Sequence, residues 1–413
     1  MRGKNECRGC GSTEIFQALD LGYSPLANRV IPEDMLESAE PWFPLVLRIC
    51  RKCHLGQLGE FATDGAIFRD YPYLSSTSST WLEENKKFAD EMIKLLNLGS
   101  EDLVMELASN DGYLLQYFMD EKLQVLGVEP ALNVATIAAV KGIPTSPEFF
   151  SEALAEDLLH RGVDPKLIVA KNVLAHVPDM RDFLRGISVL TGKSTLVVVE
   201  APSILNIIQK MQFDTIYHEH FSYLSGTFLN TVLSEFGLKI VGVENVKTHG
   251  GSLRCFITKN ESLIQPLDSW VTQLESTLNL EKKANLGAPE VWLDVERQIN
   301  LELKKIREWF SNPEGRIIGY GAAAKVVTLL SAAQIPRGLI SLCIDNSEEK
   351  MNRYIPGSHI KIVSESDYIE RDHQPQDIYV IFPWNIQGEI SNRIRAFNSR
   401  ARIFVLLPSV KEL

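Results

Sequence analysis

The stretch that decides the fold spans residues 103–112 and reads LVMELASNDG. Its first half is a continuous apolar strand pattern, its second half is a loop of small residues, and a helical pattern follows at 113–118. Small residues at positions 108, 109 and 112 let a ligand approach the backbone, as in dinucleotide-binding folds. The stretch therefore predicts a nucleoside site at the end of the first strand of a Rossmann-like α/β domain.

Two carboxylates indicate which cofactor binds there. The next strand, 125–129, ends in Glu129, 17 residues after Gly112, where a carboxylate can bind ribose hydroxyls. Glu129 could equally be an exposed strand end, but a second acid, Glu106, lies on the first strand, and the pair favours S-adenosylmethionine (SAM) over NAD. We expect five residues of this region to contact the cofactor: Glu106, Ala108, Asn110, Gly112 and Glu129.

A third strand pattern, 167–170, leads into the segment KNVLAHV at 171–177. It is similar to the strand and loop that pass beside the methionine moiety in class I methyltransferases, which implies cofactor contact by Asn172 and places His176 near the transferred methyl group. A histidine in the core is the alternative. From residue 103 to about 257, strand and helix patterns alternate, which predicts a largely parallel sheet covered by helices.

Length and composition are those of a globular enzyme. The chain has 413 residues, enough for two to four domains, and a net charge of −11, which argues against nucleic acid or an anionic membrane surface as the main partner. Its apolar runs are shorter than the ~20 residues needed to span a bilayer, and the first residues, MRGKNE, lack the apolar core of a signal peptide. We expect a cytoplasmic protein.

Four of the six cysteines form two C-x-x-C pairs. They are Cys7 with Cys10 and Cys50 with Cys53, a spacing typical of four thiolates around tetrahedral zinc. A redox pair or two disulfides are the alternatives, and a reducing cytoplasm disfavours both. Because four protein ligands leave no open coordination position, we expect the zinc to be structural.

These patterns divide the chain into four parts. We expect a zinc-binding module at 1–65, a SAM-binding catalytic domain at 66–258, a helical bridge at 259–311 and a Rossmann-like domain at 312–413. A hydroxyl-rich run at 71–80 could be a linker or a lid over a ligand. The bridge carries a helical apolar face, formed by Trp292, Val295, Ile299, Leu303, Ile306 and Phe310.

The run FDTIYHEHFSY at 213–223 holds more titratable side chains than packing requires. A histidine titrates near neutrality, a nearby carboxylate can fix its tautomer, and a tyrosine can donate to a developing oxyanion. A polar loop is one alternative. A metal site formed by His218, Glu219 and His220 is another. A strand would place the two histidines on one face, however, and no third ligand is evident near that face. We favour an active site.

Several motifs occur in an order that resembles one enzyme family. They are the two cysteine pairs, YxYxSSTS at 71–78, ExASNDG at 106–112, YHEHF at 217–221, GGSLR at 250–254, GYGAAAK at 319–325 and PWN at 383–385. Together they resemble the SAM-dependent C-methyltransferases of nucleotide-linked keto-deoxysugars, over the whole chain. The sequence departs from the usual pattern at Ala108, where many methyltransferases have glycine, and at Pro383, where a small residue is expected.

The resemblance implies a function and a set of catalytic residues. It implies methylation at C3 of a 4-keto-deoxysugar, linked to dTDP or GDP, through an enolate and without a catalytic metal. His220 would be the base, Glu219 would orient the site, and Tyr217 would contact the enolate or move a proton. Tyr71 and His176 would hold the 4-keto oxygen. Spacing alone does not separate His220 from His218.

The C-terminal part supports a second hypothesis. GYGAAA at 319–324 fits G-x-G-x-x-A, and Asp345 ends the following strand, a pattern typical of NAD-dependent oxidoreductases. We favour instead a loop that binds the diphosphate of the sugar nucleotide at a helix N-terminus. The expected substrate-binding residues are Gly321, Lys325, Trp384, Asn385 and Arg254. A non-catalytic zinc-dependent scaffold is a third possibility, but it leaves the 217–220 cluster unexplained.

Overall fold

The computed structural model describes residues 5–59, 74–246 and 250–413, which form two compact units. Unit 1 contains the described residues within 1–15, 49–205 and 221–287, and unit 2 contains 16–48, 206–220 and 288–413. Neither unit is continuous in sequence. Residues 206–220, which hold the histidine cluster, group with the C-terminal residues rather than with the sheet on either side of them in the chain.

Unit 1 is an α/β domain with a seven-stranded sheet of order β10-β11-β8-β7-β4-β5-β6. The strands are β4 (Leu103–Leu107), β5 (Gln124–Val128), β6 (Thr145–Ser146), β7 (Pro165–Lys171), β8 (Leu196–Pro202), β10 (Leu238–Val246) and β11 (Ser252–Lys259). β4 pairs in parallel with both β5 and β7, and β11 pairs antiparallel with β8 and β10. Because the chain leaves β4 on one side and returns on the other, a topological switch point lies between β4 and β7, where such sheets bind ligands.

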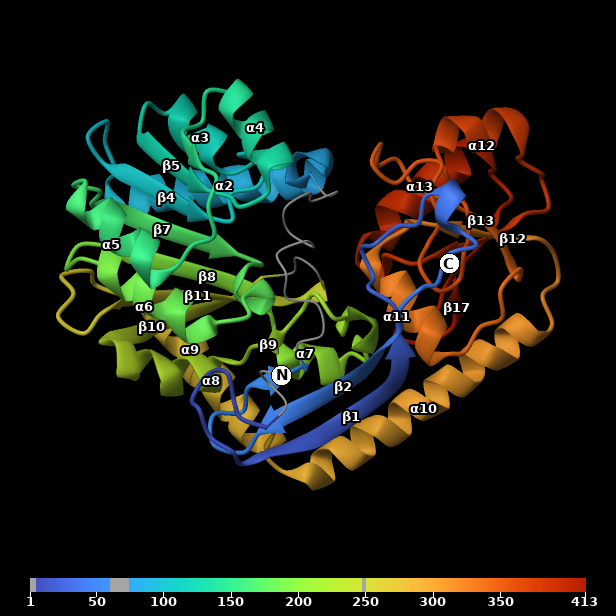
Figure 1. Cartoon of the computed structure of the whole chain (residues 1–413), viewed down its shortest axis with the longest axis horizontal. Coiled ribbons are helices and arrows are strands. Elements are labelled where there is room, and N and C mark those ends of the chain that lie inside the picture. Colours follow the sequence, from blue (N-terminus) through green and yellow to red (C-terminus); the bar gives the residue numbers. More distant parts are fainter. Residues whose placement is uncertain (1–4, 60–73, 247–249) are drawn as a thin grey trace. The chain divides into compact units, whose positions relative to one another are not determined.

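Alternation along the strands of unit 1 creates a core on each face of this sheet. On β7, Ile168 and Ala170 enter one core while Leu167 and Val169 enter the other. Figure 1 shows helices on both sides of the sheet. One core includes side chains of α5 (Glu152–His160), α6 (Met180–Leu190) and α8 (Gly226–Val232). The other includes those of α2 (Ser79–Leu96), α3 (Leu115–Asp120), α4 (Leu132–Val140) and α9 (Asp268–Ala284). These strands and helices confirm the predicted α/β class.

Unit 2 contains a second, smaller sheet of order β14-β13-β12-β15-β16-β17. Its strands are β12 (Ile317–Tyr320), β13 (Ile340–Ile344), β14 (Ile362–Val363), β15 (Ile378–Ile381), β16 (Arg402–Val405) and β17 (Lys411–Glu412). All neighbours are parallel except β16 and β17. Its helices are α10 (Pro289–Ser311), α11 (Ala324–Ala332), α12 (Glu365–Arg371) and α13 (Gln387–Phe397). Most of β1 (Ile15–Ser24) and β2 (Phe43–Cys50) also belongs to this unit.

The segment predicted as a helical bridge forms two helices, one in each unit. α9 belongs to unit 1 and α10 to unit 2. Pro289 occupies the first turn of α10, where a missing N–H costs nothing. The predicted apolar face of this helix is buried along its whole length, from Trp292 to Phe310. Its spacing of three and four residues is that of one face of an α-helix.

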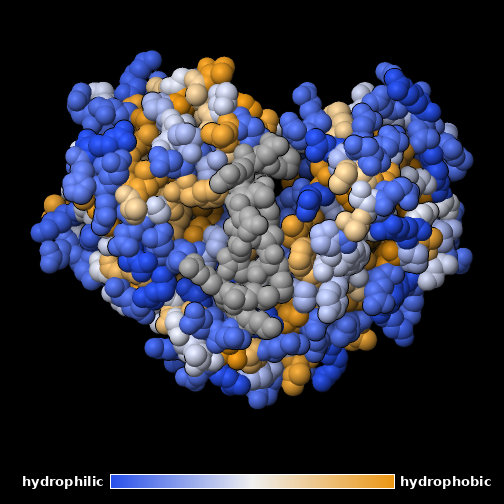
Figure 2. Space-filling view, in the orientation of Figure 1, coloured by the Kyte–Doolittle hydropathy of each residue, from blue (hydrophilic) through white to orange (hydrophobic). Residues whose placement is uncertain are grey.

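The surface in view is mostly hydrophilic, with hydrophobic residues scattered over it (Figure 2). No helix among the described residues is both long enough and apolar enough to cross a bilayer.

Candidate active site

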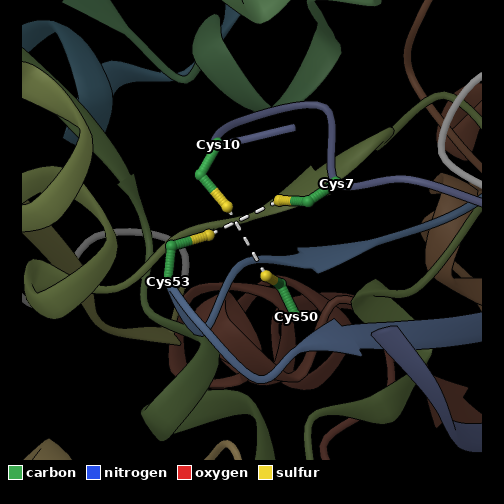
Figure 3. Close-up of side chains that lie close together, drawn as sticks. All are labelled: Cys7, Cys10, Cys50 and Cys53. Atoms are coloured by element: carbon green, nitrogen blue, oxygen red, sulfur yellow. Dashed lines mark hydrogen bonds between the residues drawn. The ribbon is translucent and has the colours of Figure 1, made fainter. Parts of the chain in front are cut away.

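The four predicted zinc ligands come together in unit 1. Their sulfur atoms all lie within 4.8 Å of one another, and Cys7, Cys50 and Cys53 are buried. Figure 3 shows the four side chains pointing toward a common centre. The Cys7–Cys53 and Cys10–Cys50 sulfurs are 3.4 and 3.6 Å apart, close to the ~3.8 Å edge of a tetrahedron with Zn–S bonds of ~2.3 Å. The donor set and its geometry therefore fit zinc.

Hydrogen bonds between these thiols shift their pKa values in a way that favours metal binding. The pKa of Cys50 is lowered because its sulfur accepts hydrogen bonds from Cys53 and Cys7. The hydrogen bond to Cys50 raises the pKa of Cys7 to about 12, and the pKa of Cys53 is raised for the same reason. Four sulfurs, three of them buried, thus lie close together, and a divalent cation would allow all of them to become thiolates.

The loop after β4 has the backbone that a nucleoside site requires. Ala108, Asn110 and Gly112 have φ values of +54°, +50° and +77°, in the left-handed region. A Cβ atom on Gly112 would lie 2.2 Å from Cδ1 of Ile143, so a larger residue would require Ile143 to move and would also be strained at this φ value. Ala108 adopts the left-handed conformation for which glycine is usual.

Glu129 lies directly after β5 and holds this loop. Its Oε2 accepts the Asn110 N–H at 2.9 Å and its Oε1 accepts the Ala131 N–H at 2.9 Å. Burial raises the pKa of Glu129, and the two N–H groups oppose that shift. Asn110 in turn accepts the backbone N–H of Ser75 through its Oδ1 at 2.9 Å. Cofactor contact by Glu129 and Asn110 remains a prediction, and the structure places both beside the switch point.

Glu106 and Asn172 lie on the two strands that flank the switch point. Glu106 belongs to β4 and is buried, and burial raises its pKa well above the ordinary value. Asn172 follows β7 with φ +55°, and its N–H donates to the Glu200 carbonyl at 2.7 Å. The Oδ1 atom of Asn172 is buried and has no hydrogen-bond partner among the described residues. A bound ligand with a polar donor would satisfy it.

Of the residues predicted to contact the reacting part of the substrate, unit 1 holds His176 and Arg254. His176 ends a short 3-10 helix (Leu174–His176) after β7 and is half-buried. Arg254 lies on β11 and is buried, and its guanidinium donates to Glu84, Glu200 and Glu244 at 2.9–3.3 Å. Each of its three guanidinium nitrogens therefore already donates to a carboxylate. Substrate contact by Arg254 stays a prediction. Tyr71 lies outside the described residues.

The side chains of the histidine cluster in unit 2 have different surroundings. The Nδ1 atom of His220 lies 3.0 Å from the Thr215 carbonyl oxygen, and its Nε2 atom lies 2.7 Å from the Tyr217 hydroxyl. Because a carbonyl only accepts, Nδ1 carries the proton, and Nε2 of the neutral ring is the basic nitrogen. Both His220 and Tyr217 are half-buried. The predicted role of His220 as a general base requires a ring that is held in this way.

His218 and Glu219, between them, face inward. His218 is buried, its Nε2 donates to the Pro44 carbonyl at 3.2 Å, and burial lowers its pKa. Glu219 is also buried, and its Oε1 accepts the Asn28 N–H at 2.8 Å. Both side chains thus attach the cluster to residues near β1 and β2. The predicted orienting role of Glu219 would therefore act through the backbone of the cluster.

The predicted substrate residues of the C-terminal part lie close together in unit 2. Gly321 follows β12 with φ +87°, and a Cβ atom there would lie 2.5 Å from Cδ of Pro383. Lys325 lies in the first turn of α11, where its ammonium donates to Oδ1 of Asn385 at 3.0 Å and sits 4.1 Å from the Trp384 ring centroid. Two motifs far apart in the sequence therefore form one cluster.

Asp345, the acid of the NAD-like pattern, binds the loop of its own domain. Its Oδ2 accepts the Ala322 N–H at 2.8 Å, and Lys350 lies 3.7 Å away. Glu129 makes the same kind of contact to the loop after β4 in unit 1.

Asp214, whose importance is not evident from the sequence, joins two of these groups. Asp214 is buried, and its Oδ2 accepts Nε1–H of Trp384 at 2.8 Å. Burial raises the pKa of Asp214 to about 6, although the Lys325 charge opposes the shift. Asp214 belongs to the 213–223 run, which was a signal of function, but its partner Trp384 lies 170 residues away in the sequence.

A largely parallel sheet with one antiparallel strand near its edge, a small-residue loop after β4 and a carboxylate after β5 form the architecture of a class I SAM methyltransferase. Known protein families match three successive parts of the chain. Residues 7–68 match a family described as "Putative zinc binding domain", 81–243 match "Methyltransferase domain", and 247–408 match "C-methyltransferase C-terminal domain". The chain is thus a SAM-dependent methyltransferase with an N-terminal four-cysteine zinc site.

The match over residues 247–408, together with similarity to a C-methyltransferase along the whole chain, identifies the protein as a SAM-dependent C-methyltransferase. It is 29% identical over 408 residues to "C-methyltransferase NovU" of Streptomyces niveus, which covers 98% of this chain and 96% of that protein. Among solved structures, magnesium protoporphyrin IX methyltransferase of Synechocystis PCC 6803 with bound SAH is 14% identical, with a TM-score of 0.34 over 45% of this chain and 89% of that one. A TehB-like methyltransferase of Corynebacterium glutamicum is 18% identical, with a TM-score of 0.31 over 43% and 87%. Scores this low carry no functional inference.

Proposed function

We propose that this C-methyltransferase methylates C3 of a nucleotide-linked 4-keto-deoxysugar, with His220 as the base. One observation carries the proposal. The Thr215 carbonyl fixes the proton of His220 on Nδ1, which leaves Nε2 as a half-buried basic nitrogen beside the Tyr217 hydroxyl. A histidine held in this way is suited to remove a proton from carbon at neutral pH.

The proposed chemistry uses the acidity of a C–H bond next to a ketone. In the structure, Nε2 of His220 accepts the Tyr217 O–H. When that hydroxyl turns to the 4-keto oxygen, Nε2 takes the C3 proton, and the electron pair delocalises onto the same oxygen as an enolate. When bound, SAM supplies an electrophilic methyl group on a sulfonium. The electron pair at C3 forms the new carbon–carbon bond as the methyl–sulfur bond breaks. A well-placed base contributes about 10²–10⁴-fold to such a reaction.

Other residues would stabilise the enolate oxygen. The Tyr217 hydroxyl, 2.7 Å from Nε2, can donate to it or return a proton to the site. We propose that His176 and Tyr71 hold the 4-keto oxygen, as the resemblance to sugar C-methyltransferases implies. Glu219 would keep the cluster in place through its bond to Asn28.

Unit 1 would hold the cofactor. Glu129 would accept the ribose hydroxyls, since a carboxylate with two backbone partners still has free lone pairs. Asn172 has a buried Oδ1 that can accept from the ligand. The backbone of the loop from Ala108 to Gly112 would lie beside the nucleoside.

Unit 2 would hold the sugar nucleotide, linked to dTDP or GDP. α11, Ala324–Ala332, begins directly after the Gly321 loop, and the positive end of a helix dipole favours a diphosphate. Lys325 adds a positive charge in its first turn, and Trp384 and Asn385 lie beside the ammonium. The same motif in an oxidoreductase would bind NAD, but the chain's family and the oriented base support methyl transfer.

The proposal is tested by incubating the purified protein with SAM and a panel of dTDP- and GDP-linked 4-keto-deoxysugars. Mass spectrometry should find one sugar that gains a single CH₂ unit, and NMR should place the new methyl group on C3. The same reaction with His220→Asn should yield little product. Methylation at oxygen or nitrogen, or no product with any 4-keto sugar, would rule the proposal out.

A further inference from the structure

The short turn before the histidine cluster is held on both sides by residues of the C-terminal part of unit 2. It is a 3-10 turn, Phe213–Thr215, and its central residue is Asp214. On one side, Trp384 donates its Nε1–H to Asp214 Oδ2 at 2.8 Å. On the other, the hydroxyl of Thr328 in α11 donates to the Ile216 carbonyl at 2.8 Å. Asp214 and Thr328 are both almost fully buried.

Between these two attachments lies the carbonyl that orients the base. Thr215 is flanked by Asp214 and Ile216, and its carbonyl oxygen is the acceptor for Nδ1–H of His220 at 3.0 Å. A carbonyl selects one tautomer of a histidine only if its own position is fixed. The side chain of Asp214 and the carbonyl of Ile216 supply that fixation from neighbouring positions in the chain.

We infer that Asp214 is a positioning residue, which anchors the 213–216 turn to Trp384 and thereby holds the Thr215 carbonyl that sets the tautomer of His220. The inference deepens the proposed function and rests on His220 as the base. Asp214 touches neither the substrate nor the cofactor in this account, so its effect on the reaction passes through the turn.

The partner of Asp214 gives the anchor a second consequence. Trp384 also stacks under the Lys325 ammonium, 4.1 Å from its ring centroid, and Lys325 is the expected partner of the sugar nucleotide's diphosphate. Asp214 therefore connects the turn that orients the base to the cluster that is expected to bind the substrate. A sugar nucleotide bound at this cluster would thus be aligned with Nε2 of His220, and an error of about 1 Å in such alignment costs about 10²-fold in rate.

Three substitutions test the inference in the full-length protein. Asp214→Leu removes the acceptor of Trp384, Asp214→Asn keeps an acceptor oxygen but removes the charge, and Thr328→Val removes the hydroxyl on the other side with little change in shape. Glu40→Gln is the matched control. Glu40 also accepts a backbone N–H in unit 2, that of Gly357 at 2.7 Å, but it does not contact the turn.

The first measurement needs no substrate. Histidine labelled with ¹⁵N reports which ring nitrogen carries the proton, and the His220 signal is identified by its loss in His220→Asn. We expect a single Nδ1–H tautomer in the wild type, Asp214→Asn and Glu40→Gln, and a mixture of tautomers in Asp214→Leu and Thr328→Val.

The second measurement is kcat and KM on the 4-keto sugar that the panel identifies. Asp214→Leu and Thr328→Val should lower kcat about ten- to a hundredfold with an unchanged KM for SAM, while Asp214→Asn should retain most of the activity. Wild-type kcat and a single tautomer in both Thr328→Val and Asp214→Leu would overturn the inference, as would an equal loss in Glu40→Gln. If Asp214→Leu does not fold, Thr328→Val decides. Full activity in His220→Asn would instead refute the proposed base, whatever the other variants do.

Discussion

Removal of the charge at Asp214 should stabilise the protein in a pH-dependent way. The carboxyl is buried, and burial raises its pKa from 3.8 to about 6, against the opposing effects of Lys325 and the Trp384 N–H. The folded state therefore keeps a proton that the unfolded state loses between these two pH values. Stability falls as the pH rises through this window, and the gap corresponds to about 3 kcal/mol at neutral pH.

Asp214→Asn has no such titration and should keep the hydrogen bond from Trp384. The assay is denaturant unfolding of Asp214→Asn and the wild type in parallel between pH 4 and pH 8. The advantage of the variant should grow with pH and level off above about pH 6, at no more than about 3 kcal/mol. An advantage that does not change with pH would mean that the carboxyl titrates normally, which would refute the reasoning from burial.

Three further substitutions test the metal site and the cofactor loop. Cys50→Ser leaves three sulfur ligands, so the zinc content measured by metal analysis should fall below the value of about one zinc per chain expected for the wild type. Thermal stability should drop with it, and a metal-free variant of full stability would contradict a structural zinc. Gly112→Ala places a Cβ 2.2 Å from Cδ1 of Ile143 and should destabilise the protein by about 1–3 kcal/mol, an expectation that unchanged denaturant midpoints would refute. Glu129→Ala loses charge-assisted hydrogen bonds of about 1.5–3 kcal/mol and should weaken SAM binding roughly ten- to a hundredfold, whereas unchanged affinity in calorimetry would show that another residue binds the ribose.

Local sequence patterns were sufficient to predict most of the secondary structure and the zinc site. The apolar run before the small-residue loop is β4, and the three- and four-residue spacing from Trp292 to Phe310 is the buried face of α10. Each C-x-x-C turn supplies two sulfurs within four residues, a spacing typical of zinc ligands, although the sulfurs that lie 3.4 and 3.6 Å apart belong to different pairs. The strand, the helix face and each cysteine pair depend on neighbours in sequence, which is why they can be recognised from the sequence alone.

Contacts over long sequence distances could not be predicted. His218 and His220 have equivalent spacing in the sequence, and they differ because Pro44, 174 residues from His218, accepts its ring N–H. The importance of Asp214 depends on Trp384, and nothing near either residue in the chain indicates the pair. The grouping of 206–220 with the C-terminal residues has the same origin, since packing decides it and the local pattern of residues does not.

Arg254 shows the limit of reasoning from motifs. Its place in GGSLR suggested a substrate contact, which stays a prediction, and the structure adds contacts with Glu84, Glu200 and Glu244 that the motif does not indicate. A charged residue in a motif is equally consistent with a ligand contact and with a buried ion pair. The three carboxylates come from α2, β8 and β10, far from Arg254 or from one another in the sequence, so the motif alone could not predict them.

Proton exchange at C3 tests the central claim most directly. The wild type, His220→Asn and His218→Asn are incubated in D₂O with the sugar nucleotide, and deuterium at C3 is followed by mass spectrometry and NMR. The account predicts exchange with the wild type and with His218→Asn, no exchange with His220→Asn, and methyl transfer by His220→Asn reduced at least ~10²-fold with SAM binding nearly intact. Exchange at the wild-type rate in His220→Asn, with its loss in His218→Asn, would contradict the assignment of the base.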